Sequence, residues 1–258
     1  MASRSLGEGY RIIAPSRFGY LRSPMPVDAS HAAQADRLAA LLDTVAVPRA
    51  VVLAVSAGAQ PATQLALRHP ERVQALVLVV PALHLPVEPG VPPPSGPPGF
   101  VLDHVLASDF IVWMLGRLAP NLLLRAAGVP YAPNAEVAPE LRKEIVDGFL
   151  SASARHVGLA HDIRTTTPTA PDLPIEQLSM PVMLTATADD PYRTGDVLRY
   201  SAGRLPTATA LLLKTGGHLL IGQDERIQRE IRRFLTAHGI APGPALAGKS
   251  TSDSQERH

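Results

Sequence analysis

The chain has 258 residues, 46% of them hydrophobic, which suits one large α/β domain with a substantial core. Its 24 basic and 23 acidic residues leave a net charge of only +1, and no basic cluster stands out, which argues against nucleic acid as a partner. Because the sequence contains no cysteine, disulfides, thiolate metal sites and cysteine nucleophiles are excluded.

The first motif that carries chemistry is a serine at a predicted junction of strand, turn and helix. Residues 48–53 form an apolar strand, residues 60–68 favour a helix, and Ser56 lies between them. Ala54 and Gly58 are small, as we expect where a sharp turn brings two backbones together. The pattern is typical of a nucleophile elbow, which exposes the serine at the end of a strand. A plain turn serine is the alternative.

A long segment separates this region from the next predicted strand. Roughly one hundred residues lie between Val80 and Pro181, which is too many for a plain crossover. We therefore predict a helical cap over residues 84–170, inserted into an α/β core made of residues 1–83 and 171–241.

The predicted cap begins with a hinge rich in proline and glycine, residues 86–99. Its helices are expected over residues 100–118, 121–127 and 139–153. In the first helix, Phe110, Trp113 and Met114 either line an apolar substrate pocket or pack the cap onto the core.

Two acids and a histidine follow the later strands. Residues 181–186 form a short apolar strand that leads to Asp189 and Asp190. The next predicted strand, residues 208–214, leads to His218. A serine, then an acid, then a histidine, each after a strand, is the chain order of one type of catalytic triad.

Together these segments resemble the α/β-hydrolase family, in its capped serine esterase or lipase-like branch, from about Gly9 to Leu235. The segments that carry the resemblance are residues 10–23, the serine pentapeptide 54–58, residues 68–73, the turn of Asp189, Asp190 and Pro191, and the turn of Gly216, Gly217 and His218. The resemblance implies an α/β fold with a mostly parallel sheet, helices on both faces and a helical cap.

The resemblance also implies roles for individual residues. Ser56 matches the nucleophile, His218 the general base and Asp190 the orienting acid, with Asp189 as the alternative acid. A serine hydroxyl is a weak nucleophile at neutral pH, so an imidazole must remove its proton during attack. The N–H of Ala57 matches one oxyanion donor. No cofactor and no metal ion are expected.

In the family, the first strands precede the segment that residues 9–16 match, and the loop after the third strand supplies a second oxyanion donor. Residues 1–8 are too few for three strands of about five residues each. We therefore expect an N-terminally truncated fold with an opened sheet.

The expected function is that of a serine hydrolase, which cleaves an ester or related acyl bond of a small apolar substrate through an acyl-Ser56 intermediate. One alternative is a truncated, catalytically impaired protein of the same fold that binds a ligand or partner. Carbon–carbon bond hydrolysis, lactone hydrolysis and cofactor-free haloperoxidase chemistry are further alternatives within the fold.

The N-terminus has no apolar run after its first arginine, so we expect no signal peptide and a cytoplasmic protein without a membrane span. The oligomeric state stays open. Residues 242–258 are rich in small and polar residues and are expected to be disordered.

Overall fold

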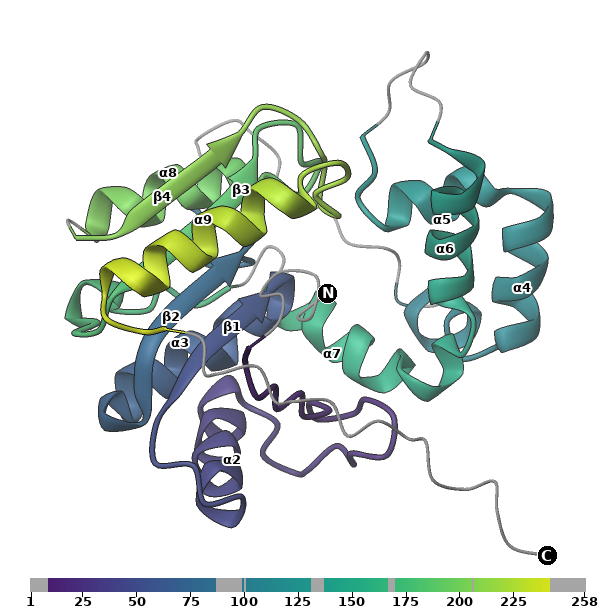
Figure 1. The fold of residues 1–258 in the computed structure, drawn as a ribbon. Coiled ribbons are helices and arrows are strands. Elements are labelled where there is room, and N and C mark those ends of the chain that lie inside the picture. The colour runs from purple at the N-terminus through teal and green to yellow at the C-terminus, as the bar shows by residue number, and fades with distance from the viewer. Residues whose placement is uncertain are drawn as a thin grey trace, which may run out of the picture.

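A computed structural model describes residues 9–86, 99, 101–130, 137–166, 170–205 and 207–241. Within these residues, four parallel strands form one sheet in the order β1-β2-β3-β4 (Figure 1). The strands are β1 (Ala50–Val55), β2 (Val73–Val79), β3 (Val182–Thr187) and β4 (Thr209–Leu213). The predicted α/β fold with a parallel sheet is confirmed.

Two hydrophobic cores cover the two faces of the sheet, because side chains alternate in direction along each strand. In β2, Leu76 and Leu78 belong to one core, whereas Ala75 and Val77 belong to the other. Every residue of β3 is buried, as expected for a strand in the middle of a parallel sheet. In the described part of the sheet, β1 and β4 are the outer strands, and their side chains are more exposed.

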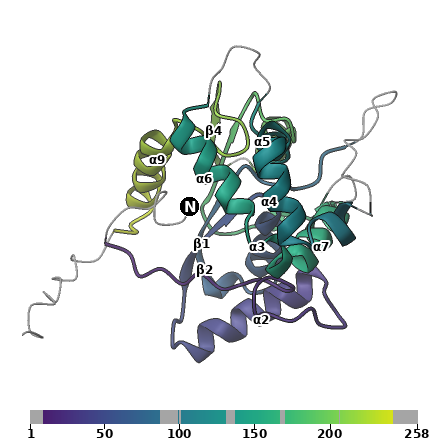
Figure 2. The same ribbon diagram turned by 90° about the vertical axis from the view of Figure 1, so that its right-hand side faces the viewer.

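Helices pack on both faces of the sheet (Figures 1 and 2). One core contains side chains of α2 (His31–Thr44), α3 (Ala59–Arg68) and α8 (Thr194–Arg204), and the other contains those of α9 (Asp224–Ala237). Short 3-10 turns, η2 (Pro70–Arg72) and η5 (Ile175–Gln177), precede β2 and β3. The sheet is thus the central layer between two helical layers.

Further helices lie between β2 and β3 in the chain, and we call the described residues from 101 to 166 the insert. Its elements are the π-helical η3 (Val101–Val105), α4 (Asp109–Leu118), α5 (Pro120–Ala126), α6 (Pro139–Phe149), the 3-10 turn η4 (Ala152–Ala154) and α7 (His156–Thr166). Helices α4, α5 and α6 stand apart from the sheet, and α7 lies between them and β1 (Figure 1).

The structure corrects some details that were predicted for this region. The sequence predicted no helix at α7, and it extended the preceding helix to residue 153, whereas α6 ends at Phe149. The predicted hinge at residues 86–99 lies mostly outside the described residues, and the predicted disordered tail lies wholly outside them.

The large apolar residues of α4 lie on its outward face. Phe110, Trp113 and Met114 are 68%, 48% and 37% exposed, whereas Val112 on the other side of the helix is buried. The Arg117 guanidinium lies 5.7 Å from the centre of the Trp113 ring. The exposure of Phe110 and Trp113 contradicts the alternative in which they pack the insert onto the core. It also gives no support for the alternative in which they line an apolar pocket. No helix in the described part of the chain is long and apolar enough to cross a bilayer.

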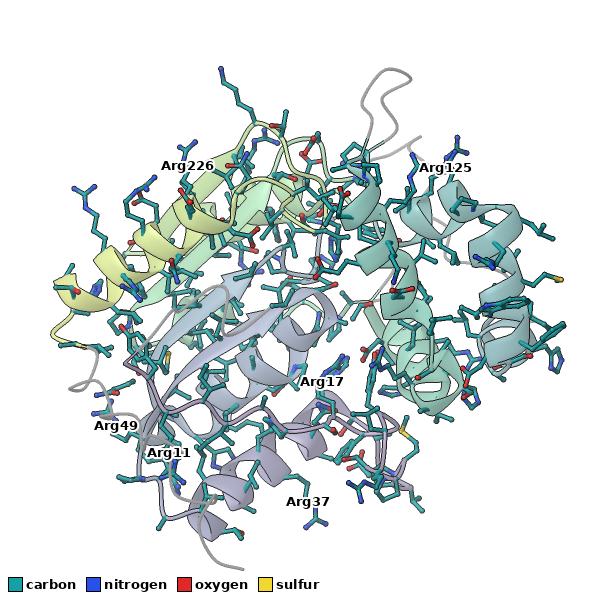
Figure 3. All side chains as sticks on the ribbon, turned by 45° about the vertical axis from the view of Figure 1, so that its right-hand side comes forward. Arg11, Arg17, Arg37, Arg49, Arg125 and Arg226 are labelled. Carbon is teal, nitrogen blue, oxygen red and sulfur yellow. The ribbon has the colours of Figure 1, made fainter. Side chains whose placement is uncertain are left out.

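A cluster of charged and aromatic residues ties α7 to the segment before α2. Arg17 forms a two-pronged ion pair with Asp162, with Nη1 at 2.7 Å from Oδ1, and the Tyr20 hydroxyl donates to Asp162 Oδ2 at 2.5 Å. Burial and the anionic Asp162 both raise the pKa of the Tyr20 phenol. A Cβ atom on Gly158 would come within 2.2 Å of the Tyr20 ring, so only glycine allows this contact. Arg17 turns inward, whereas Arg226 extends outward (Figure 3).

We predict that Asp162→Asn lowers the free energy of unfolding by roughly 3 kcal/mol, because it leaves the largely buried Arg17 guanidinium without its anionic partner. The matched control is Asp147→Asn, which removes an exposed pair with Lys143 and should change stability by less than about 1 kcal/mol. Urea unfolding followed by circular dichroism measures both. Equal losses in the two variants would contradict the anchoring role.

Candidate active site

Ser56, Asp190 and His218 come from three loops that leave the sheet at the same edge. Ser56 directly follows β1, Asp190 follows β3, and His218 follows β4. The parallel register places the carboxyl ends of neighbouring strands side by side. The fold therefore brings the three predicted residues together, although they are far apart in the sequence.

The backbone at Ser56 has the sharp turn that the sequence predicted. Ser56 has a φ of 54°, a left-handed conformation, and it begins the 3-10 turn η1 (Ser56–Gly58), which leads directly into α3. A non-glycine residue in this region is strained by about 1–3 kcal/mol and persists only where its surroundings hold it. Here the strand fixes one side of the turn, and the helix fixes the other.

The small residues of the turn are only partly explained by this geometry. Ala54 and Ala59 are buried in the core, at 7% and 0% exposure, so a larger side chain at either position would have to displace packed neighbours. Gly58 has an ordinary helical φ of −62°, and a Cβ atom on it would meet its nearest neighbour at 3.9 Å. Position 58 therefore has room for a Cβ atom, so the turn does not require glycine itself there.

Hydrogen bonds join the three side chains into a chain. His218 Nε2 lies 2.8 Å from Ser56 Oγ, and His218 Nδ1 lies 2.8 Å from Asp190 Oδ2. Asp190 is fully buried, and the His218 side chain is 13% exposed. Because a carboxylate only accepts hydrogen bonds, Nδ1 carries the proton, and the lone pair of Nε2 faces the serine hydroxyl. The imidazole is therefore placed to accept a proton from Ser56.

The two adjacent acids make different contacts. Asp189 accepts hydrogen bonds from the backbone N–H groups of Gly216 and Gly217, at 3.2 and 2.9 Å. It therefore shapes the turn before His218, while Asp190 contacts the imidazole itself. Of the two acids that the sequence left as candidates, only Asp190 meets the histidine ring.

Two residues near Asp190 had no role in the sequence analysis. The Tyr192 N–H donates to Asp190 Oδ1 at 2.9 Å, and the Thr194 hydroxyl donates to Asp190 Oδ2. The Tyr192 ring stands edge-on to the His218 ring, with 4.9 Å between centroids. The contact with Tyr192 could have been anticipated, since an aspartate in a turn commonly accepts a hydrogen bond from the backbone N–H two residues on.

Ala57 is the middle residue of η1, two positions before α3 begins. Backbone N–H groups at the start of a helix carry partial positive charge and suit a developing anion. The oxyanion role of Ala57 stays a prediction that this position favours. We assign no second donor among the described residues.

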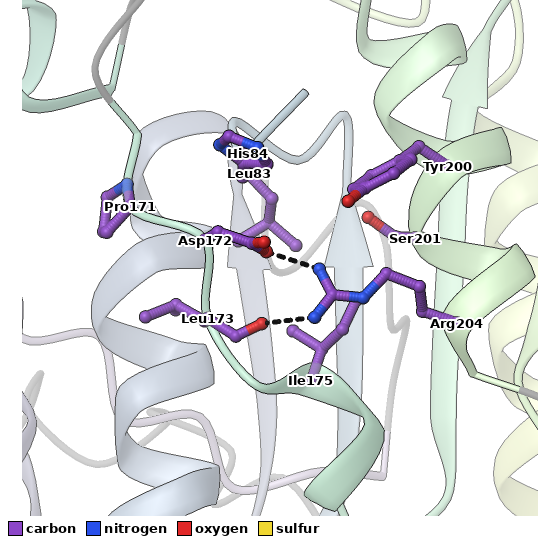
Figure 4. A pocket seen from close by; sticks show the side chains of 9 residues that line it. All are labelled: Leu83, His84, Pro171, Asp172, Leu173, Ile175, Tyr200, Ser201 and Arg204. Carbon is purple, nitrogen blue, oxygen red and sulfur yellow. Dashed lines mark hydrogen bonds and ion pairs between the residues drawn. The ribbon is translucent and has the colours of Figure 1, made fainter. Parts of the chain in front are cut away.

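A small pocket lies elsewhere, where the chain leaves β2 and returns toward β3 (Figure 4). It lies between His84, Asp172 and Tyr200, and Arg204 beside it pairs with Asp172 and Glu176. Its volume of about 10 Å³ suits one water molecule. Ser56, Asp190 and His218 do not line it.

Within the residues that the structure describes, no group of three acids or histidines could hold a metal ion.

Comparison with known proteins agrees with this fold. The α/β hydrolase fold family matches residues 2–225. An α/β hydrolase fold protein from Nakamurella multipartita is 22% identical, with 86% of this chain and 81% of that chain covered and a TM-score of 0.61.

A thermophilic esterase from Thermogutta terrifontis is 20% identical, with 85% and 77% covered and a TM-score of 0.59. The enol-lactonase from Burkholderia xenovorans LB400 is 19% identical, with 84% and 78% covered and a TM-score of 0.60. At these identities the solved structures establish the fold alone, whereas the family match spans most of the sequence. The chain therefore belongs to the α/β-hydrolase fold family.

Proposed function

We propose that this protein is a serine hydrolase that cleaves a carboxylic ester, or a related acyl bond, through an acyl-Ser56 intermediate. The observation that carries the proposal is the hydrogen-bond chain from buried Asp190 through His218 to Ser56. Membership of a hydrolase family supports it. Nucleophile, base and orienting acid are thereby assigned to three residues in contact.

In the first half of the reaction, Ser56 Oγ attacks the carbonyl carbon while His218 Nε2 takes the hydroxyl proton. The imidazolium that forms is stabilised by the Asp190 carboxylate on its other nitrogen. Collapse of the tetrahedral intermediate breaks the bond to the leaving alkoxide, which receives the proton from His218. The acyl group then remains on Ser56.

In the second half, a water molecule takes the place of the alcohol. His218 removes one proton from this water as it attacks the acyl carbon, and the proton passes to Ser56 Oγ when the ester bond breaks. The carboxylic acid is released and gives its remaining proton to the solvent, so that the site returns to its starting state. The Ala57 N–H would stabilise the oxyanion in both halves, an effect typically of about 3 kcal/mol for each donor.

The substrate class follows from the bond that this chemistry cleaves. Linear esters and lactones both present a carbonyl with an alkoxide leaving group, so the same steps apply to each. Structures of similar fold include an esterase from Thermogutta terrifontis and an enol-lactonase from Burkholderia xenovorans LB400. Simple p-nitrophenyl esters therefore make suitable first probes, and a lactone makes a second.

We predict that Ser56→Ala lowers kcat for p-nitrophenyl acetate, butyrate and octanoate by at least about 1000-fold, because it removes the nucleophile. The control is Ser23→Ala, which removes a surface hydroxyl bonded to the Ser16 carbonyl and should leave kcat unchanged. Circular dichroism checks that both variants are folded. A folded wild-type protein without Ser56-dependent turnover would instead indicate a ligand-binding protein of the same fold.

A second prediction separates the two acids. Asp190→Asn should lower kcat by about 1000-fold or more, because an amide at this position favours the wrong imidazole tautomer. Asp189→Asn should have a much smaller effect, about 10-fold, because it weakens backbone contacts of Gly216 and Gly217 without touching the ring. Steady-state kinetics on one ester measures both. The reverse ranking would identify Asp189 as the functional acid.

A further inference from the structure

The end of helix α5 makes direct contact with the loop that carries His218. We call residues 126–130 the α5 turn. The His218 backbone N–H donates to the Gly128 carbonyl at 2.9 Å, and the Tyr192 hydroxyl donates to the Ala126 carbonyl at 2.8 Å. The insert therefore accepts hydrogen bonds from the histidine itself and from a neighbour of Asp190.

Packing at this contact is close enough to require glycine on both sides. Gly128 has a φ of +76°, and a Cβ atom on it would lie 2.3 Å from the His218 Cβ and 2.9 Å from the Tyr192 ring. A Cβ atom on Gly217 would lie 2.4 Å from Pro130 Cδ. The two backbones are thus too close for a side chain to lie between them, so the α5 turn cannot move toward the histidine loop without displacing it.

Tyr192 contacts Asp190, His218 and the insert at the same time. Its backbone N–H contacts Asp190, its ring stands edge-on to His218, and its hydroxyl reaches Ala126 in the insert. The ring is 44% exposed, yet burial of its other side and the charge of Asp190 raise the pKa of the phenol. The hydroxyl therefore stays protonated, and able to donate to the Ala126 carbonyl, at pH values where an ordinary tyrosine begins to ionise.

We propose that the α5 turn holds His218 in its working orientation, with Tyr192 as the positioning residue, so that the position of the insert controls the geometry of the site. This inference rests on the proposed function of Ser56 and His218. Its physical basis is the steep dependence of proton transfer on geometry, since a misplacement of about 1 Å can slow a reaction about 100-fold. Movement of the insert away from the sheet would break both hydrogen bonds together.

The first test uses Gly128→Ala, with Gly239→Ala as a matched control. Gly239 has a φ of +73°, and a Cβ atom on it meets nothing within 4 Å, so the control carries the same backbone strain without the contact to His218. We expect kcat for p-nitrophenyl butyrate to fall about 100-fold in Gly128→Ala, with KM changed less than about 2-fold. Gly239→Ala should retain wild-type kcat.

The second test uses Tyr192→Phe, which keeps the ring and the backbone contact with Asp190 but loses the hydrogen bond to Ala126. We expect kcat to fall about 3- to 10-fold, the size of one net hydrogen bond, with KM again little changed. This variant changes one oxygen atom, so it remains informative if Gly128→Ala does not fold.

A spectroscopic signal separates this inference from the proposed function. The proton on His218 Nδ1 should give a downfield resonance in the proton NMR spectrum, identified by its loss in Asp190→Asn. The resonance should shift or broaden in Gly128→Ala and Tyr192→Phe, but not in Gly239→Ala. This holds whether or not the chosen ester is a substrate.

Unchanged kcat and an unchanged resonance in both variants would overturn the role of the α5 turn while leaving the serine hydrolase proposal intact. Conversely, a shifted resonance in a protein without Ser56-dependent turnover would support the link between insert and histidine and reject the ester hydrolase. An equal loss of kcat in Gly128→Ala and Gly239→Ala would show that backbone strain alone is responsible.

Discussion

The candidate site depends on one constraint, the parallel pairing of strands β1, β2, β3 and β4. Because the strands run in one direction, the loops after β1, β3 and β4 leave from a single edge of the sheet. The buried strands β2 and β3 set the lateral spacing between these loops. Ser56 and His218 therefore meet at hydrogen-bond distance across 162 positions of sequence.

Two of the contacts that attach the insert to this framework differ in their chemistry. At α7, a guanidinium, a phenol and a carboxylate form a largely buried cluster that joins the helix to the segment before α2. At the α5 turn, backbone carbonyls accept hydrogen bonds and glycines permit close approach. Both attachments also include backbone hydrogen bonds, from Gly158 to the Gly19 carbonyl at the first and from His218 to the Gly128 carbonyl at the second. The insert is therefore held at both places by backbone contacts as well as by side chains.

Much of the site could be predicted because its signals are local. Ser56 and His218 each follow an apolar run that forms a strand, and small or turn-forming residues surround them. The exposure of the outer face of α4 could not be predicted, since periodicity shows that Phe110 and Trp113 share a face but not whether another element covers that face. Helix α7 was missed because its partners, Arg17 and Tyr20, lie far away in the sequence.

The sequence by itself determined the fold class, and it placed Ser56, the acid pair Asp189 and Asp190, and His218 after three different strands. These depend on apolar runs and turn residues that act over a few positions. Only the tertiary structure decided that Asp190 meets the imidazole while Asp189 holds the preceding turn, and that Tyr192 reaches Ala126. The two acids are adjacent and chemically identical, so their roles are set by groups that chain folding brings from 28 positions away.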